Sequence, residues 1–292
     1  MWILDCVITH NLWHSKVQML DRYNTTYWDN TDYDMIIMGS SRGMVQYSPQ
    51  ILDSLLGVNS YNLSCNGRCI DAQYNIFNAY CRNHAKPKVI IQNIDHLTLY
   101  MSNMYEREQY LPYIKHDKEL YNATKETERF DWSDIAIPLK RYAGYINMIS
   151  EGLHIKNKMH NPYNEYKGYE GRERVWDGSE FKKIDTIGFG TNPEADSIFE
   201  HYLTFCKDND IQVILVFAPI YIGATEKLGD GQKRMEDTFQ KYADRYEIPI
   251  LNYIYDSINY DTLNFYNATH LNRRGAELFS TKLAHDLKEL LQ

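Results

Sequence analysis

The sequence predicts an α/β protein in which helices cover both faces of a parallel sheet, and three observations carry this prediction. Short apolar runs at 35–38, 89–91 and 211–217 have the composition of buried strands. Segments with helical spacing alternate with these runs along the chain. Strands that alternate with helices are typical of a parallel sheet in a three-layer α/β/α arrangement.

The first helix after the first strand has clear end signals. Ser48 is an N-cap residue, Pro49 suits the first helical position, and Gly57 suits the end. The other elements follow from apolar spacing, turn residues and β-rich composition. Strands are expected at 35–38, 61–63, 89–91, 211–217 and 249–251, and helices at 48–57, 70–82, from 192, at 235–246 and at 271–291.

The domain organisation follows from where this alternation fails. Residues 1–29 are expected to form an N-terminal extension, and 30–292 one domain with an insertion at about 99–190. The insertion is rich in Tyr, Asn, Lys and Glu, with one expected apolar helix at 139–153. Because Tyr and Trp are too frequent there for disorder, we expect a mostly helical or loop segment that covers the site.

Composition excludes several classes of function. The net charge of -8, without clustered cations, argues against nucleic-acid binding. No stretch approaches the ~20 apolar residues of a membrane span. The first nine residues are apolar but lack a basic leader, so they predict no signal peptide, and either the tail of a removed anchor or a native first helix fits them. Five cysteines, an odd number, imply neither a disulfide framework nor a zinc site.

Two short segments carry residues that suit nucleophilic catalysis. Gly39, Ser40 and Ser41 follow the first strand, and His270 lies where the last helix is expected to open. A serine hydroxyl needs a neighbouring base to become a nucleophile, and histidine is the commonest base. Each segment alone fits a plain turn or a helix cap. Because the carboxyl ends of parallel strands share one edge of the sheet, we expect Ser41 and His270 to meet there.

A hydrolytic serine also needs donors that hold a developing oxyanion. Gly67 lacks a side chain and can approach a substrate closely. Asn93 follows the third strand and can offer its amide group. Both positions also fit ordinary turn residues.

With these positions together, the chain resembles the SGNH hydrolase superfamily, also called GDSL-like esterases. Gly39-Ser40-Ser41 is similar to the first block of that family, with Ser40 in place of Asp and Ser41 as nucleophile. Gly67 matches the second block, and Asn93 is a loose match to the third. Asn267-Ala268-Thr269-His270 is similar to the fourth block, Asp-x-x-His, with His270 as base. The matched blocks cover roughly 30–98 and 192–292.

The resemblance implies a flavodoxin-like sheet and a serine esterase or acyl transferase that needs no metal or organic cofactor. The Gly-Ser-Ser turn and the residues after His270 look most like the branch of D-alanyl-lipoteichoic acid transfer and alginate acetylation proteins. That branch implies an O-acyl group on a carbohydrate or cell-envelope polymer, and its members are often exported or membrane-tethered. Arg42 and Arg172 are candidates for substrate binding.

One residue departs from the family pattern, since Asn267 stands where the family has aspartate. An asparagine can orient His270 through its carbonyl oxygen but supplies no charge. Three interpretations stay open: a Ser-His-Asn site, a Ser-His pair aided by Asp256 or Asp261, and a site without activity. The alternatives to an enzyme are a catalytically inactive carbohydrate-binding or assembly protein of the same fold and a flavodoxin-like nucleotide binder.

Overall fold

The computed structural model describes residues 1–100, 107–154, 164–179 and 189–291. The chain divides into two compact units. Unit 1 consists of Met1–Thr31, Asn75–His84 and Ser102–Pro162, and unit 2 consists of Asp32–Tyr74, Ala85–Met101 and Tyr163–Gln292. All the residues of the predicted site therefore belong to unit 2.

Unit 2 is built on a parallel sheet. Within the described residues the sheet has five strands in the order β2-β1-β3-β6-β7, and all its neighbouring pairs are parallel. The strands are β1 (Met35–Met38), β2 (Ser60–Asn62), β3 (Val89–Asn93), β6 (Gln212–Phe217) and β7 (Ile250–Asn252). This is the flavodoxin-like strand order, so the predicted fold class is confirmed.

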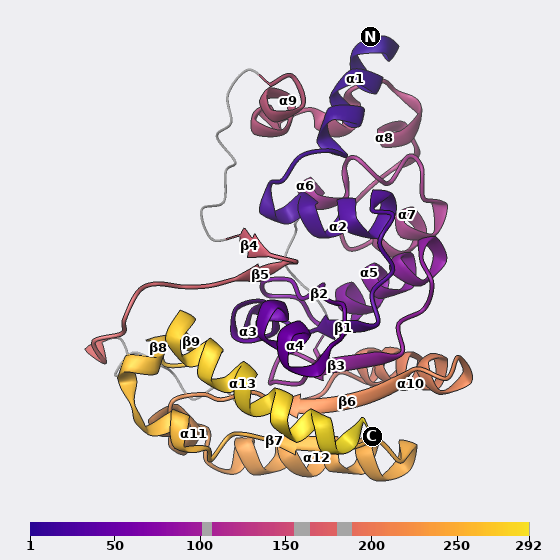
Figure 1. Cartoon of the computed structure of the whole chain (residues 1–292). Coiled ribbons are helices and arrows are strands. Elements are labelled where there is room, and N and C mark those ends of the chain that lie inside the picture. The colour runs from indigo at the N-terminus through magenta and orange to yellow at the C-terminus, as the bar shows by residue number, and fades with distance from the viewer. Residues whose placement is uncertain (101–106, 155–163, 180–188, 292) are drawn as a thin grey trace. The chain divides into compact units, whose positions relative to one another are not determined.

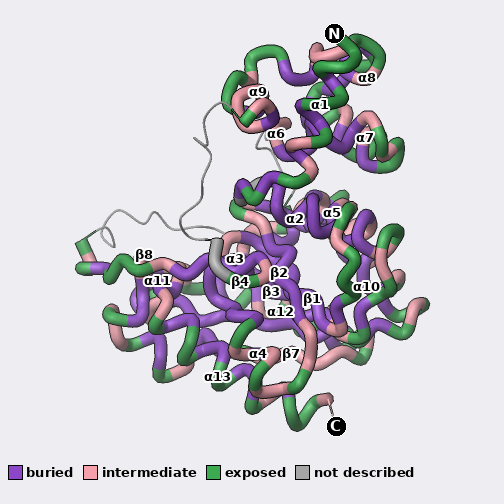
Figure 2. The backbone as a smooth tube through the Cα atoms, turned by 45° about the horizontal axis from the view of Figure 1, so that its top comes forward, coloured by how far each residue is buried: buried purple, intermediate pink, exposed green. Residues whose placement is uncertain are grey.

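The central strands are the most deeply buried part of the sheet. Every residue of β1 is buried, and so are the last four residues of β3 and the last five of β6 (Figure 2). Continuous apolar runs, not alternating ones, therefore encode these strands, because helices cover both of their faces.

Helices pack on the two faces of the sheet and complete the three layers. On one face Phe239 of α12 contacts both Phe217 of β6 and Phe199 of α10, each at 5.8 Å between ring centroids. The connection from β1 to β2 carries α3 and α4 on the other face, where α13 packs along α4 (Figure 1). The helices of this unit are α3 (Ser41–Gln46), α4 (Pro49–Leu56), α10 (Pro193–Asp208), α11 (Ile222–Leu228), α12 (Asp230–Tyr246) and α13 (Arg273–Leu290), and α5 (Ile70–Asn83) begins here and ends in unit 1.

The helix ends follow the local signals in the sequence. Pro49 occupies the first turn of α4, and Gly57 ends the helix in the left-handed conformation, with φ of 69°. The Asn192 side chain caps α10 by accepting from Glu194 N–H. These are the signals from which both helices were predicted.

A small hairpin lies on the edge strand of the sheet. The strands β4 (Asn164–Tyr166) and β5 (Tyr169–Glu170) pair antiparallel, and Gly168 lies in the turn between them. A Cβ atom on Gly168 would lie 2.1 Å from the Asn62 carbonyl oxygen. Asn62 N–H donates to the Lys167 carbonyl at 2.9 Å, so the hairpin covers the end of β2.

Unit 1 is helical in its described residues. Its elements are α1 (Trp2–Leu12), α2 (Gln18–Trp28), α6 (Arg107–Tyr110), α7 (Lys118–Thr124), α8 (Trp132–Ala136), the 3-10 helix η1 (Lys140–Tyr142) and α9 (Ile146–Gly152). The single helix expected at 139–153 is wrong. Leu139 and Gly144 both have positive φ, at 65° and 88°, and these positions break the segment into η1 and α9.

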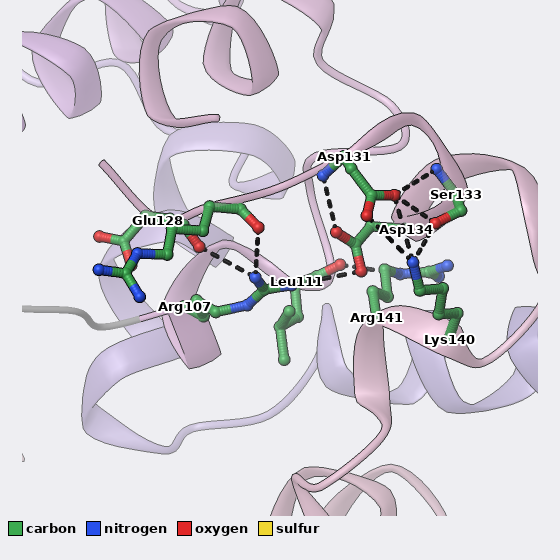
Figure 3. A network of polar contacts seen from close by, with 9 residues as sticks. Arg107, Leu111, Glu128, Asp131, Ser133, Asp134, Lys140 and Arg141 are labelled. Carbon is green, nitrogen blue, oxygen red and sulfur yellow. Dashed lines mark hydrogen bonds and ion pairs between the residues drawn. The ribbon is translucent and has the colours of Figure 1, made fainter. Parts of the chain in front are cut away.

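Polar contacts hold the short helices of unit 1 together (Figure 3). Arg141 donates to the Leu111 carbonyl at 2.9 Å and pairs with Asp5 of α1 at 3.0 Å. Arg107 pairs with Asp134 at 3.2 Å, and Asp134 completes a capping box with Asp131 at the start of α8. These contacts join helices that also share an apolar core, in which Leu12, Leu20 and Leu111 are fully buried.

Candidate active site

The turn after β1 places Ser41 at the start of a helix. β1 ends at Met38, Gly39 and Ser40 form the turn, and α3 begins with Ser41. A Cβ atom on Gly39 would lie 2.8 Å from Cβ of Asn93, so only glycine fits here without displacing β3. The turn therefore presents the half-buried Ser41 at the carboxyl edge of the sheet.

His270 comes to the same edge on a hairpin. The strands β8 (Phe265–Asn267) and β9 (His270–Leu271) pair antiparallel, with Asn267 opposite His270. The prediction that His270 opens the last helix is wrong, because Asn272 is the N-cap and α13 begins at Arg273. The Asn272 amide also donates to the Leu263 carbonyl at 2.8 Å, which ties the hairpin to the helix.

The structure brings the two predicted residues into contact. Ser41 Oγ lies 2.7 Å from His270 Nε2, although 229 positions separate them in the sequence. The other ring nitrogen, Nδ1, lies 3.0 Å from Oδ1 of Asn267 and 3.0 Å from the Thr269 hydroxyl. The side chains Ser41, His270 and Asn267 thus form a chain of hydrogen bonds in the order that a nucleophile, a base and an orienting group require.

The neighbours of Asn267 fix the tautomer of His270. Thr269 N–H, which can only donate, bonds the Asn267 side chain at 3.0 Å and so identifies its Oδ1 as the carbonyl oxygen. An acceptor at this place requires His270 Nδ1 to carry the hydrogen. Nε2 is then free to accept from the Ser41 hydroxyl, which is the state that a general base needs.

The electrostatics of the site favour the neutral form of His270. Burial, and then the charge of Arg42, lower the pKa of His270 to about 3, with smaller effects of the same sign from His96 and Arg172. Asp95 opposes this shift. Since Asn267 carries no charge, the described residues place no carboxylate in contact with the ring to stabilise an imidazolium.

Neither aspartate that could have replaced the family acid takes that place. Asp256 accepts from Ile258 N–H at 3.0 Å and pairs with Lys282. Asp261 accepts from Leu263 N–H at 3.0 Å and pairs with Arg274 at 3.5 Å.

A buried ionic cluster lies beside the Ser41 turn. Arg42 is 4% exposed, and its guanidinium lies 3.2 Å from Nδ1 of His96. Asp95 is 1% exposed, and it accepts from the Ser40 hydroxyl at 2.5 Å and from the Asn93 amide at 3.2 Å. Burial raises the pKa of Asp95, but the Arg42 charge and the hydrogen bonds from the Ser40 hydroxyl and Leu97 N–H outweigh it and hold that pKa below its usual value. Ser40, the alternative serine of the turn, is therefore committed to Asp95.

The two predicted oxyanion residues differ in their placement. Gly67 lies in a turn with φ of 66°, and Cys65 N–H of this turn donates to the Gly39 carbonyl at 3.1 Å. The turn is thus tied to the Ser41 loop. Asn93 is fully buried, with its carbonyl accepting from Tyr47 at 2.9 Å and its amide donating to Asp95.

Arg172 lies near the histidine hairpin. Its carbonyl accepts from Arg273 N–H at 2.8 Å, and its guanidinium donates to the fully buried Glu170 at 3.0 Å. The guanidinium also lies 6.0 Å from the centre of the Tyr266 ring, which is 5.3 Å from the His270 ring. Arg172 is thus near the site but is already paired with a carboxylate.

Sequence reasoning missed His96, Asp95 and Thr269. The available signal was position, since Asp95 and His96 directly follow the third strand, at the edge where ligands of such sheets bind. Among the described residues there is no group of three metal-ligating side chains, and no described helix is long and apolar enough to cross a bilayer. None of the five cysteines, which all lie in the described residues, forms a disulfide.

Comparison with known proteins gives only distant structural likenesses. No family model matches the sequence, and no curated protein does. Solved structures similar to this chain include a candidate acylhydrolase from Bacteroides fragilis, at 12% identity over 96% of this chain and 97% of the other, with a TM-score of 0.43. A candidate platelet activating factor of Streptococcus pneumoniae aligns at 12% identity over 95% and 92%, with a TM-score of 0.47. A GDSL-like lipase from Bacteroides thetaiotaomicron aligns at 12% identity over 87% and 88%, with a TM-score of 0.40. Likeness at this level assigns no role to any residue of the chain.

Proposed function

We propose that the protein is a serine esterase or acyl transferase of the SGNH type that acts through Ser41, His270 and Asn267. The observation that carries this proposal is the hydrogen-bonded chain from Ser41 Oγ to His270 Nε2 and from His270 Nδ1 to Asn267 Oδ1. A neutral imidazole with a free Nε2 beside a serine hydroxyl is the arrangement that activates a nucleophile.

In the first half of the reaction Ser41 Oγ attacks the carbonyl carbon of an ester, and its proton passes to His270 Nε2. The bond between the carbonyl carbon and the leaving oxygen then breaks, and His270 returns the proton to that oxygen. The product is an acyl group on Ser41 and a free alcohol. Asn267 keeps the ring oriented throughout, with its carbonyl on Nδ1–H.

In the second half an incoming hydroxyl attacks the acyl group on Ser41 and gives its proton to His270. The Ser41–acyl bond breaks, and the proton returns to Ser41. If the hydroxyl belongs to water, the protein is a hydrolase, and if it belongs to another molecule, the protein is an acyl transferase. We propose a carbohydrate or cell-envelope polymer as the carrier of the O-acyl group, on the resemblance of the ordered sequence blocks.

Backbone amides are the proposed donors to the oxyanion. The Ser41 N–H is in the first turn of α3, where backbone N–H groups have no partner within the helix, and the Ser40 hydroxyl bonds Asp95 instead of capping this helix. The Gly67 N–H belongs to the turn tied to Gly39. Asn93 is a weaker candidate, because its side chain is fully buried and its amide already donates to Asp95.

A second candidate function is a catalytically inactive binding or assembly protein of the same fold. The observation that favours it is that an uncharged residue, Asn267, accepts from Nδ1–H of His270, so this hydrogen bond adds no negative charge to stabilise a cation. A base whose pKa is lowered to about 3 is a weak one. The two candidates differ in whether Ser41 reacts.

The test compares the parent protein with Ser41→Ala and with Ser54→Ala, a control on the exposed side of α4. We expect the parent and the control to turn over p-nitrophenyl acetate and to form a phosphonyl–Ser41 bond with a fluorophosphonate, with loss of fluoride. Loss of one triad member leaves only a small residual rate. The turnover rate of Ser41→Ala should therefore be lower than that of the parent by a factor of about 10⁴ or more, and this variant should take no label. Equal rates for Ser41→Ala and the parent would remove Ser41 from the mechanism. No labelling of the parent at any pH would favour the binding protein.

A further inference from the structure

The turn that follows β3 carries a histidine whose surroundings fix its hydrogen. His96 Nδ1 lies 3.2 Å from the Arg42 guanidinium. A guanidinium only donates, so Nδ1 must accept. His96 is therefore the neutral tautomer with its hydrogen on Nε2, and burial followed by the Arg42 charge lowers its pKa to about 4.

The Nε2–H group of His96 is available to a ligand. Among the residues that the structure describes, it has no hydrogen-bond partner, although the side chain is half-buried. Because His96 is only half-buried, this N–H can reach water in the free protein and can exchange that water for a substrate atom. Asn93, which sequence reasoning placed in this role, is fully buried and already bonded at both ends of its amide.

Two observations place His96 beside the reacting groups. Its partner Arg42 is the residue next to Ser41 in α3. In addition, Asp95, the residue before His96, accepts from the hydroxyl of Ser40, the residue before Ser41, at 2.5 Å.

The turn itself holds His96 rigidly. Asp95 accepts from Leu97 N–H at 2.8 Å, and Asp95 N–H donates to the Thr98 hydroxyl at 2.9 Å. The same carboxylate accepts a hydrogen bond from the Ser40 hydroxyl, so one buried group fixes both the turn of Ser41 and the turn of His96. A donor fixed in this way needs little reorganisation during a reaction, which is the property that an oxyanion hole requires.

We propose that His96 is a catalytic residue that donates its Nε2–H to the carbonyl oxygen of the ester, and that Arg42 is the positioning residue that holds its tautomer. This inference rests on the proposed serine mechanism. As Ser41 Oγ attacks, the carbonyl oxygen gains the negative charge, and the Nε2–H hydrogen bond shortens without transfer of its proton. When the carbonyl re-forms, the bond weakens again, so His96 ends each half-reaction unchanged.

The experiment uses the full chain and two matched substitutions. His96→Phe keeps a planar ring and removes the donor, and His96→Gln keeps an N–H donor on a side chain of similar length. Each variant is assayed with a p-nitrophenyl ester and with the matching thionoester, whose sulfur accepts hydrogen bonds poorly. Thermal unfolding is measured alongside.

Removal of one oxyanion donor costs roughly 10²–10³ in rate, so we expect such a loss of kcat/KM for His96→Phe with the oxygen ester. The loss should be much smaller with the thionoester, so the ratio of the oxygen-ester rate to the thionoester rate should fall. His96→Gln should recover part of the oxygen-ester rate and part of this ratio. A merely structural role would lower the two rates together. Arg42→Gln should lower the same ratio and also move the acid limb of the pH profile upward, because it removes a cation that lowers the pKa of His270.

Either of two results would overturn the inference: His96→Phe within about twofold of the parent, or equal losses with both esters in His96→Phe and His96→Gln. If His96→Phe does not fold, the ratio for His96→Gln and Arg42→Gln decides, and an unchanged ratio in both overturns it. Failure of the serine mechanism is distinguishable, because Ser41→Ala would then remain active whatever the His96 variants do.

Discussion

Asn267 decides how strong a base His270 can be. Its carbonyl orients the ring as an aspartate would, but the position contributes no negative charge. In serine proteases the equivalent exchange of aspartate for asparagine is damaging because it disturbs the tautomer. Here the Thr269 N–H holds the Asn267 carbonyl oxygen toward His270, so the tautomer is correct and only the charge is missing.

A prediction at this position concerns the pH profile. The lowered pKa keeps His270 neutral well below pH 6.5, so the acid limb of kcat/KM in the parent should lie far below that value. Asn267→Asp adds a negative charge beside Nδ1, raises the pKa of His270, and should move the acid limb to higher pH with a higher plateau. The measurement is kcat/KM from pH 3 to 9, and an acid limb at the same pH in both proteins would contradict the prediction. Asn267→Ala, the control, should lower the plateau without moving the limb upward.

Among the elements, the junction of the β8–β9 hairpin with α13 positions His270 at the carboxyl edge of the sheet. Asn272 caps α13 by accepting from Gly275 N–H at 3.1 Å and at the same time donates to two carbonyls of the preceding segment. A Cβ atom on Gly275 would lie 2.1 Å from the Asn264 carbonyl oxygen. The helix and the turn that leads into the hairpin can therefore approach this closely only with glycine at 275.

This close approach predicts that replacing Gly275 by alanine changes the stability in the opposite direction to most such replacements in helices. Gly to Ala in a helix interior normally stabilises by about 1 kcal/mol. Gly275→Ala should instead destabilise by about 1–3 kcal/mol, because the backbone of the turn before the hairpin must move, and it should lower esterase activity as well. Thr281→Ala, at an exposed position of the same helix, is the control and should be neutral or slightly stabilising. Urea unfolding checks both, and a Gly275→Ala protein as stable as the parent would show that the junction is not tight.

Across the whole molecule, neutral, half-buried histidines make the fold sensitive to acid. The pKa values of His96 and His270 are lowered to about 4 and about 3. The unfolded chain takes up protons at these positions below about pH 6.5, where the folded chain does not. The folded state therefore binds fewer protons, and stability must fall as the pH falls through this window.

We accordingly predict that the free energy of unfolding decreases between pH 6.5 and pH 4, by up to about 1.4 kcal/mol per pH unit for each such histidine. Urea midpoints at pH 7.5, 6, 5 and 4, followed by circular dichroism, measure this. His270→Gln removes one titrating group and should reduce the slope. A midpoint independent of pH over this range would contradict the lowered pKa values.

The sequence by itself determined the alternation of strands and helices, because apolar runs, N-caps such as Asn192 and ends such as Gly57 act through nearby residues. The apolar spacing of 139–153 predicted one helix and did not reveal the break at Leu139. A positive φ at that residue depends on contacts with the surrounding structure. The candidate nucleophile and base could be named from the blocks around Ser41 and His270.

Only the tertiary structure decided which polar groups of the site are already bonded to protein and which are not. Asn93 ends β3 and His96 lies three positions later, yet Asn93 is fully buried with its amide bonded and His96 keeps an N–H without a partner among the described residues. The physical reason is that a hydrogen bond depends on the positions of atoms from distant segments. Here those segments are the Ser41 turn, the turn after β3 and the hairpin of His270, and the parallel sheet brings them to one edge.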